Sequence, residues 1–251
     1  MRRTCSSSQP GHSQKGEARL NFPTPFTAVF DFSFSKCCIV LLAISLIGLI
    51  PLVLAKDTVF TLDPAVLDAA EEKYGVAARA RLLAWQALIQ AENLEADIAK
   101  LEKVNDFFNQ FDFISDVLHW QKKDYWATPI EFLASNGGDC EDFALAKYFT
   151  LKKIGVEETK LNMTYVKAWQ LNQAHMVVTY YAKPASEPLV LDNLVKKIEP
   201  ASKRTDLLPV FSFNGSSLWI SKERGRGNLI GKSDRLALWN DLLKIMPDGL
   251  K

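Results

Sequence analysis

The stretch GGDCEDFALAKYFTLKKIG, residues 137–155, carries the strongest structural signal in the sequence. A helix is predicted from about Asp139 or Cys140 to Ile154, with two lysines in its last turn and Gly155 directly after it, as is typical of a helix C-terminus. Apolar residues lie on most sides of this helix, so it should be buried at the centre of a domain. The sequence therefore places Cys140 in the first turn of a central helix.

The sequence before this stretch is helical in pattern. Two or three helices are expected over residues 63–116, where Asp63 fits an N-cap and the proline after it fits the first helical position. A polar and aromatic connector (122–129) and a short helical turn (130–134) follow. The half of the domain before Cys140 is therefore predicted to be helical.

The sequence after the central helix alternates with the period of a β-strand and ends in one more helix. Helices followed by strands predict an α+β domain, in which the central helix packs on an antiparallel sheet. The predicted strands are 163–169, 175–181 and 189–194, with 217–221 as a further candidate, and the closing helix is 233–245.

The N-terminus contains an uncharged apolar run at residues 39–55, directly after Lys36, which ends in Val-Leu-Ala. The run is short for a spanning helix, which needs about 20 apolar residues, and its small-residue ending is typical of a signal peptidase site. We predict an N-terminal extension and signal sequence over residues 1–55, cleaved after Ala55, and one domain over 56–251. After cleavage no stable membrane insertion is expected, and the alternative is an uncleaved signal anchor.

The composition excludes some classes of protein and singles out one thiol. The chain is 48% hydrophobic, which is enough for a core, and its formal net charge of +1 does not indicate a nucleic-acid partner. Of the four cysteines, only Cys140 lies beyond residue 55. Exported proteins usually pair their cysteines as disulfides, so a single remaining thiol suggests a chemical role.

Cys140, His175 and Asp192 are the residue types of a cysteine-protease triad. A cysteine in the first turn of a helix faces unpaired backbone N–H groups and the positive end of the helix dipole, which favour the thiolate. The glycines before it would let a substrate backbone approach closely. His175 opens one predicted strand and Asp192 lies in the next, so antiparallel pairing would bring the imidazole and the carboxylate together.

Each member of this triad also has a simpler interpretation. Cys140 could be an inert buried cysteine, His175 a histidine at a strand edge, and Asp192 the first residue of an Asx turn. His119 is a second candidate base, although its place at a helix end leaves no obvious partner. A zinc site is not favoured because no second cysteine or histidine pair has the usual ligand spacing.

Four segments of the sequence are considered together: YWATP (125–129), GDCEDFA (138–144), AHMV (174–177) and LDN (191–193). They resemble the bacterial transglutaminase-like cysteine proteases of the LapG type. This resemblance implies a papain-like α+β fold, a periplasmic location and dependence on calcium. It also implies a substrate, the N-terminal region of a large surface adhesin whose cleavage releases cells from biofilms. The implied regulator is an inner-membrane receptor for cyclic-di-GMP, which sequesters the protease through its periplasmic domain.

Calcium is expected beside the nucleophile, bound by Asp139 and Glu141, with Asp142 as a further ligand. Uncompensated, these carboxylates would repel one another and raise the pKa of the neighbouring Cys140 thiol. A hard cation with oxygen ligands removes that conflict. The alternative is helix capping, in which the acidic residues satisfy backbone N–H groups.

Trp126 is expected to anchor a protein interface, because it is a rigid aromatic residue in a polar connector just before the catalytic turn. The alternative is a core tryptophan that covers the central helix. The sequence as a whole predicts a calcium-dependent periplasmic cysteine endopeptidase. Two other functions stay open, an acyl transferase or amidase with the same triad and a non-catalytic calcium-binding adaptor.

Overall fold

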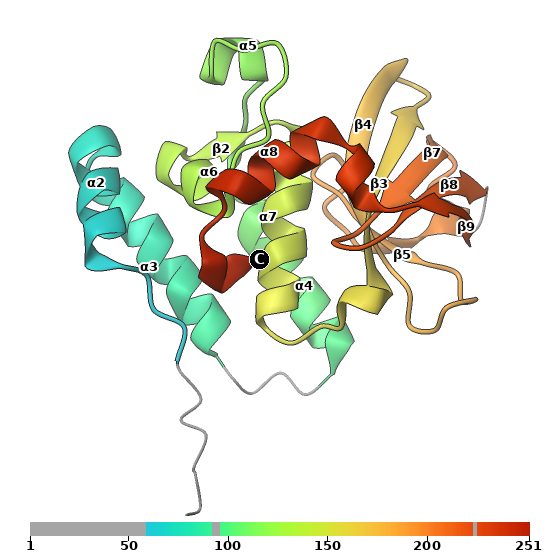
Figure 1. Cartoon of the computed structure of the whole chain (residues 1–251), viewed down its shortest axis with the longest axis horizontal. Coiled ribbons are helices and arrows are strands. Elements are labelled where there is room, and N and C mark those ends of the chain that lie inside the picture. Colours follow the sequence, from blue (N-terminus) through green and yellow to red (C-terminus); the bar gives the residue numbers. More distant parts are fainter. Residues whose placement is uncertain (1–58, 92–95, 223–224) are drawn as a thin grey trace, which may run out of the picture. The chain divides into compact units, whose positions relative to one another are not determined.

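The computed structural model describes residues 59–91, 96–222 and 225–251 (Figure 1). The fold described below is that of the compact unit Asp57–Lys251. The apolar run at 39–55 and its expected cleavage point lie outside the described residues. Within the described ranges, no helix combines the length and apolarity needed to cross a bilayer.

The half of the domain before Cys140 is helical, as predicted. Asp63 caps the first described helix by accepting a hydrogen bond from the Ala65 N–H at 2.8 Å, and a proline occupies the first turn. The elements are α2 (Pro64–Tyr74), α3 (Val76–Gln90), α4 (Asp97–Phe108), β1 (Asp112–Phe113), α5 (Asp116–His119), α6 (Pro129–Ser135) and β2 (Gly137–Gly138).

The predicted central helix is α7 (Cys140–Lys153), and Gly155 follows it with a positive φ of 86°. Ten of its residues are buried, from Asp142 to Leu151, because it is enclosed by other helices and by the sheet. Figure 1 shows α2 and α3 on one side of α7 and the sheet on the other. The prediction that this helix is buried at the centre of the domain is therefore confirmed. Cys140 is the first residue of the helix.

The sheet is seven-stranded and antiparallel, with the strand order β6-β5-β4-β3-β7-β8-β9. The predicted strands are present with slightly different ends, and the sheet packs one face on α7. The strands are β3 (Leu161–Ala168), β4 (Gln173–Tyr180), β5 (Leu189–Leu191), β6 (Glu199–Pro200), β7 (Leu207–Phe213), β8 (Leu218–Lys222) and β9 (Gly225–Gly231).

Two longer strands were not predicted, and the closing helix is shorter than expected. β7 contains Pro209, which a central strand normally excludes, and here the proline lies next to a β-bulge opposite Tyr165 and Val166. β9 contains three glycines, which weaken the strand signal. A 3₁₀ turn (Ser233–Arg235) precedes α8 (Ala237–Ile245), so the predicted helix 233–245 is divided.

Gly137 and Gly138 allow close contacts with other parts of the chain itself, the backbone of Asp112 and the side chain of Asp142. β2 pairs in parallel with β1, with Gly137 opposite Asp112. Gly137 has a φ of 154°, and a Cβ there would collide with the Asp112 carbonyl. A Cβ at Gly138 would collide with the Asp142 side chain. The glycines therefore allow the turn before Cys140 to pack, and their expected role in admitting a substrate backbone stays a prediction.

Candidate active site

The thiol of Cys140 lies where the first turn of α7 meets β4. The Cys140 side chain is half-buried, and its sulfur is 2.8 Å from Glu141 Oε2 and accepts a hydrogen bond from the backbone N–H of Met176. Met176 directly follows His175 on β4, and α7 packs against that strand. The fold therefore brings the thiol to the end of the strand that carries the candidate base.

His175 and Asp192 form a buried pair, with 2.7 Å between His175 Nε2 and Asp192 Oδ1. The pair forms because β4 and β5 are antiparallel neighbours and Asp192 is the first residue after β5. Since Nε2 is engaged with the carboxylate, Nδ1 is the ring nitrogen available to a thiol. Asp192 Oδ1 also accepts from the Leu194 N–H at 3.0 Å, so the Asx turn and the histidine contact coexist.

Two buried basic side chains that sequence reasoning missed, Arg204 and Lys147, also contact Asp192, and burial lowers the pKa of Lys147 to about 7. Arg204 Nη2 lies 2.6 Å from Asp192 Oδ2, and Lys147 Nζ donates to the Asp192 carbonyl oxygen at 3.0 Å. Burial alone would raise the pKa of Asp192, but hydrogen bonds from His175, Leu194 and Arg204 lower it to about 2. The carboxylate is therefore held in its ionised form. In the sequence, a lysine within an otherwise apolar helix could have indicated that Lys147 has a buried partner. No sequence pattern indicated the contact of Arg204 with Asp192.

The surroundings of Cys140 oppose formation of a thiolate. Burial raises the pKa of Cys140, and the negative charges of Glu141 and Asp139 raise it further. The Met176 N–H acts in the opposite direction. The electrostatic conflict expected from the sequence is thus present in the fold.

The expected calcium ligands lie together, and the fold adds Asp116 to them. One group contains Asp139, Glu141 and the Cys140 sulfur, and a second contains Asp116, Asp139 and Asp142, with the ligand atoms of each group within 4.8 Å of one another. Burial raises the pKa of Asp116, Asp139 and Asp142, and mutual repulsion adds to the effect. Asp116 is separated from this turn in the sequence, so spacing alone could not identify it.

Asp139 and Asp142 form a capping box at the start of α7, so the capping expected as the alternative is present, while some carboxylate oxygens in the described part of the chain remain without donors. Asp142 accepts from the Ala127 N–H at 2.7 Å and from the Asp139 N–H at 3.4 Å, so it joins the connector to the helix start. Asp116 Oδ1 and Asp139 Oδ1 are buried, and neither has a hydrogen-bond partner within the described residues. Buried carboxylate oxygens without donors are the chemistry that a hard cation such as calcium satisfies.

Trp126 combines features of a core residue and of a cleft wall. Its side chain is 9% exposed and stacks on Phe213, with 5.8 Å between ring centroids and 13° between ring planes. Trp126 also lines a mainly apolar cleft beside the nucleophile, together with Glu141 and Met176. The core packing expected as the alternative is therefore present, and a role in partner binding stays a prediction.

His119 lies at the end of α5 and its ring is engaged elsewhere. Nε2 is 2.8 Å from the Ser135 hydroxyl oxygen, and the ring packs edge-on against Trp120. Of the two histidines in the described residues, His175 is the one bound to a buried carboxylate.

The chain is similar to a known family and to solved structures. Residues 84–219 match a family described as bacterial transglutaminase-like cysteine proteinase. EGTA-treated LapG of Legionella pneumophila is 45% identical, with 72% of this chain and 95% of that chain covered and a TM-score of 0.63. Calcium-bound LapG of the same organism is also 45% identical, with 72% and 96% covered and a TM-score of 0.61. No curated protein matches the sequence.

The family match spans more than half of the chain, and the solved structures cover nearly three quarters of it at high identity. The fold supports the same assignment, with a cysteine-bearing helix packed on an antiparallel sheet. The protein therefore belongs to the bacterial transglutaminase-like cysteine proteinases of the LapG type.

Proposed function

We propose that the protein is a calcium-dependent periplasmic endopeptidase that cuts the N-terminal region of a large surface adhesin. In this proposal, the periplasmic domain of an inner-membrane cyclic-di-GMP receptor binds and restrains the protease. The observation that carries the catalytic part is the 2.7 Å contact between His175 and Asp192, on the strand whose next residue, Met176, donates its backbone N–H to the Cys140 sulfur. Membership of a cysteine proteinase family supports the reaction type.

In the proposed reaction, the Cys140 sulfur attacks the scissile carbonyl carbon and the C–N bond breaks. His175 takes the thiol proton and gives it to the leaving amine, which leaves a thioester on Cys140. Water then attacks the thioester while His175 takes a proton from it, the C–S bond breaks to release the carboxylic acid product, and His175 passes the proton to the sulfur. Asp192 accepts the Nε2–H of His175, so it keeps Nδ1 directed to the thiol and stabilises the imidazolium. The backbone N–H of Cys140 is the first donor proposed for the oxyanion.

Calcium is proposed to bind the carboxylates of Asp139 and Glu141, with Asp116 and Asp142 as further oxygen ligands. When bound, the ion supplies positive charge that offsets the repulsion among these carboxylates and their effect on the thiol. The unsatisfied oxygens of Asp116 and Asp139 favour this assignment. A calcium-bound solved relative at 45% identity also supports it.

Cleavage of adhesin N-terminal fragments by the purified mature protein tests the proposed function. We expect two fragments with new termini by mass spectrometry, and none with Cys140→Ala. If an added amine is incorporated at the cut instead of water, the protein is an acyl transferase. A thiol-reactive peptide electrophile should label Cys140, and absence of both labelling and cleavage would favour a non-catalytic adaptor.

Export is proposed because the run 39–55 ends in a sequence typical of signal peptidase sites. N-terminal sequencing of the protein from its native host should begin near Lys56, and the protein should be in the periplasmic fraction. A full-length species confined to the cytoplasm would contradict export.

Trp126→Glu should weaken binding of the receptor's periplasmic domain by at least about 30-fold, the scale of an aromatic residue that dominates an interface. Trp126 lines the cleft beside the nucleophile, where a docked partner would cover the site. Binding is measured by isothermal titration calorimetry, and circular dichroism reports the fold. Trp169→Glu is the matched control, since Trp169 is 66% exposed and away from that cleft. Loss of folding in Trp126→Glu, or unchanged binding, would assign Trp126 to the core alone.

A further inference from the structure

The Asp192 carboxylate is bound on both oxygens, and Arg204 holds the one that His175 does not. Oδ1 contacts His175 Nε2 and the Leu194 N–H, and Oδ2 contacts Arg204 Nη2 at 2.6 Å. Arg204 is 4% exposed and Asp192 is 1% exposed. A carboxylate bound on both oxygens from different elements cannot rotate freely. Arg204 therefore constrains the orientation that the triad requires.

Arg204 is itself fixed by a second carboxylate nearer to solvent. Arg204 Nε lies 2.9 Å from Asp206 Oδ1 and Nη2 lies 2.7 Å from Asp206 Oδ2. The Asp206 side chain is 31% exposed. A chain of contacts thus runs from a half-exposed aspartate through Arg204 and Asp192 to His175.

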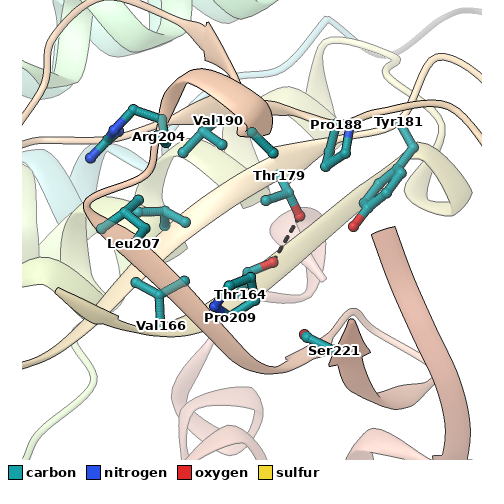
Figure 2. Close-up of a pocket in the computed structure, with 12 residues that line it drawn as sticks. Thr164, Val166, Thr179, Tyr181, Pro188, Val190, Arg204, Leu207, Pro209 and Ser221 are labelled. Carbon is teal, nitrogen blue, oxygen red and sulfur yellow. Dashed lines mark hydrogen bonds between the residues drawn. The ribbon is translucent and has the colours of Figure 1, made fainter. Parts of the chain in front are cut away.

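The rest of the Arg204 side chain contributes to a cavity on the face of the sheet away from α7 (Figure 2). The guanidinium group points away from Val190 and Thr179, which line the same cavity. The Thr179 hydroxyl lies 2.8 Å from that of Thr164. The side chain of Arg204 packs against the other residues of the cavity wall, and its guanidinium group contacts the carboxylates of Asp192 and Asp206.

We propose that Arg204 is a positioning residue of the protease, which acts on His175 by holding the Asp192 carboxylate in its ionised form and in one orientation. This inference rests on the proposed triad. Arg204 touches neither the thiol nor the imidazole, so its effect on the reaction must pass through Asp192.

The charged groups that face Asp192 determine how its ionisation responds to Arg204. They are His175 on β4, Lys147 on α7, Arg204 after the 3₁₀ turn Ala201–Lys203, and Asp206 behind Arg204. Burial raises the pKa of Asp192, and His175, the Leu194 N–H and Arg204 together lower it to about 2. Because the active form is ionised, activity is lost as the pH falls through this pKa. Removal of Arg204 raises the pKa, so this loss should begin at a higher pH.

Arg204→Met should lower kcat by about 10- to 100-fold, the range for loss of a hydrogen bond to a charged group. KM should change little, since Arg204 is buried away from the cleft. On the acid side of the pH profile, the fall in kcat should begin at a higher pH than in the parent enzyme. Arg204→Lys retains the positive charge but lacks the planar guanidinium group with its several donors. Its decrease in kcat and its shift of the pH profile should therefore both be smaller than those of Arg204→Met.

Arg79→Met is the matched control, because Arg79 also bridges two carboxylates, Asp68 and Glu71, but on the surface of the helical half. This variant should keep the kcat and pH profile of the parent. A purely structural role of Arg204 would reduce the amount of folded enzyme, seen by circular dichroism, without moving the pH profile of the folded fraction. If Arg204→Met does not fold, Arg204→Lys decides the question.

A double-mutant cycle tests whether Arg204 acts through Asp192. In an Asp192→Asn background, Arg204→Met should lower kcat by less than about threefold, because the carboxylate that Arg204 holds is already absent. An equal loss in both backgrounds, or an unchanged kcat and profile in folded Arg204 variants, would overturn the inference. Cleavage that persists in Cys140→Ala would instead refute the proposed function. If no substrate is cut, the rate of Cys140 labelling by the peptide electrophile is compared among the same variants, and equal rates would also overturn it.

Discussion

His175→Ala should lower kcat for peptide cleavage by about six orders of magnitude, the loss typical of removing the base from a triad. His175 is the histidine whose ring contacts a buried carboxylate, and its free Nδ1 is proposed to hold the thiol. Without it the proposed triad loses its base, and the thiol keeps only its contacts to Glu141 and to the Met176 N–H, of which Glu141 is a proposed calcium ligand. The measurement is single-turnover cleavage, with circular dichroism to confirm that the variant is folded.

Two further variants separate the catalytic histidine from a general effect of mutation. Asp192→Asn should lower kcat by about four orders of magnitude, because an amide cannot hold the same tautomer of His175. His119→Ala should stay within about threefold of the parent, since its ring contacts Ser135 instead of Asp192. A His119 variant as inactive as His175→Ala, or a His175 variant with parental kcat, would contradict the proposed triad.

Removal of calcium should nearly abolish cleavage and lower Tm by roughly 5–10 °C. An ion present at 100 times its Kd stabilises the folded state by about 2.7 kcal/mol, which corresponds to this shift for a domain of this size. The reason is that buried oxygens of Asp116 and Asp139 lack donors among the described residues, so without the ion repulsion among the carboxylates destabilises the turn that carries Cys140. Cleavage and thermal unfolding are measured with a calcium-selective chelator and after calcium is restored.

Single substitutions identify which carboxylates hold the ion. Asp139→Asn should lose most of the calcium-dependent shift in Tm, because Asp139 belongs to both acidic groups. Comparison of Glu141→Gln with Asp116→Asn then shows which group dominates. Asp68→Asn is the control, since that carboxylate is exposed and paired with Arg79. Parental activity in chelator, or parental calcium affinity in Asp139→Asn, would return these residues to helix capping.

Much of the architecture could be predicted because it depends on neighbouring residues. The ends of α7 follow from the residues around Cys140 and Gly155, and the first described helix begins at its Asp63 cap. β7 could not be predicted in this way, because Pro209 is tolerated only through a bulge against β3. The glycines of β9 are likewise accommodated by pairing with β8, which local sequence does not report.

The sequence by itself determined the helix that presents Cys140, the strand that presents His175 and the acidic turn, because each depends on short-range periodicity and capping. Only the tertiary structure decided which groups surround them. Arg204 meets Asp192 through the packing of a turn after β6, and Lys147 reaches the Asp192 carbonyl across 45 positions. Asp116 joins the acidic turn because β1 pairs with β2 and α5 follows β1. Such long-range contacts form only when the chain closes its loops and buries the core, so no local pattern records them.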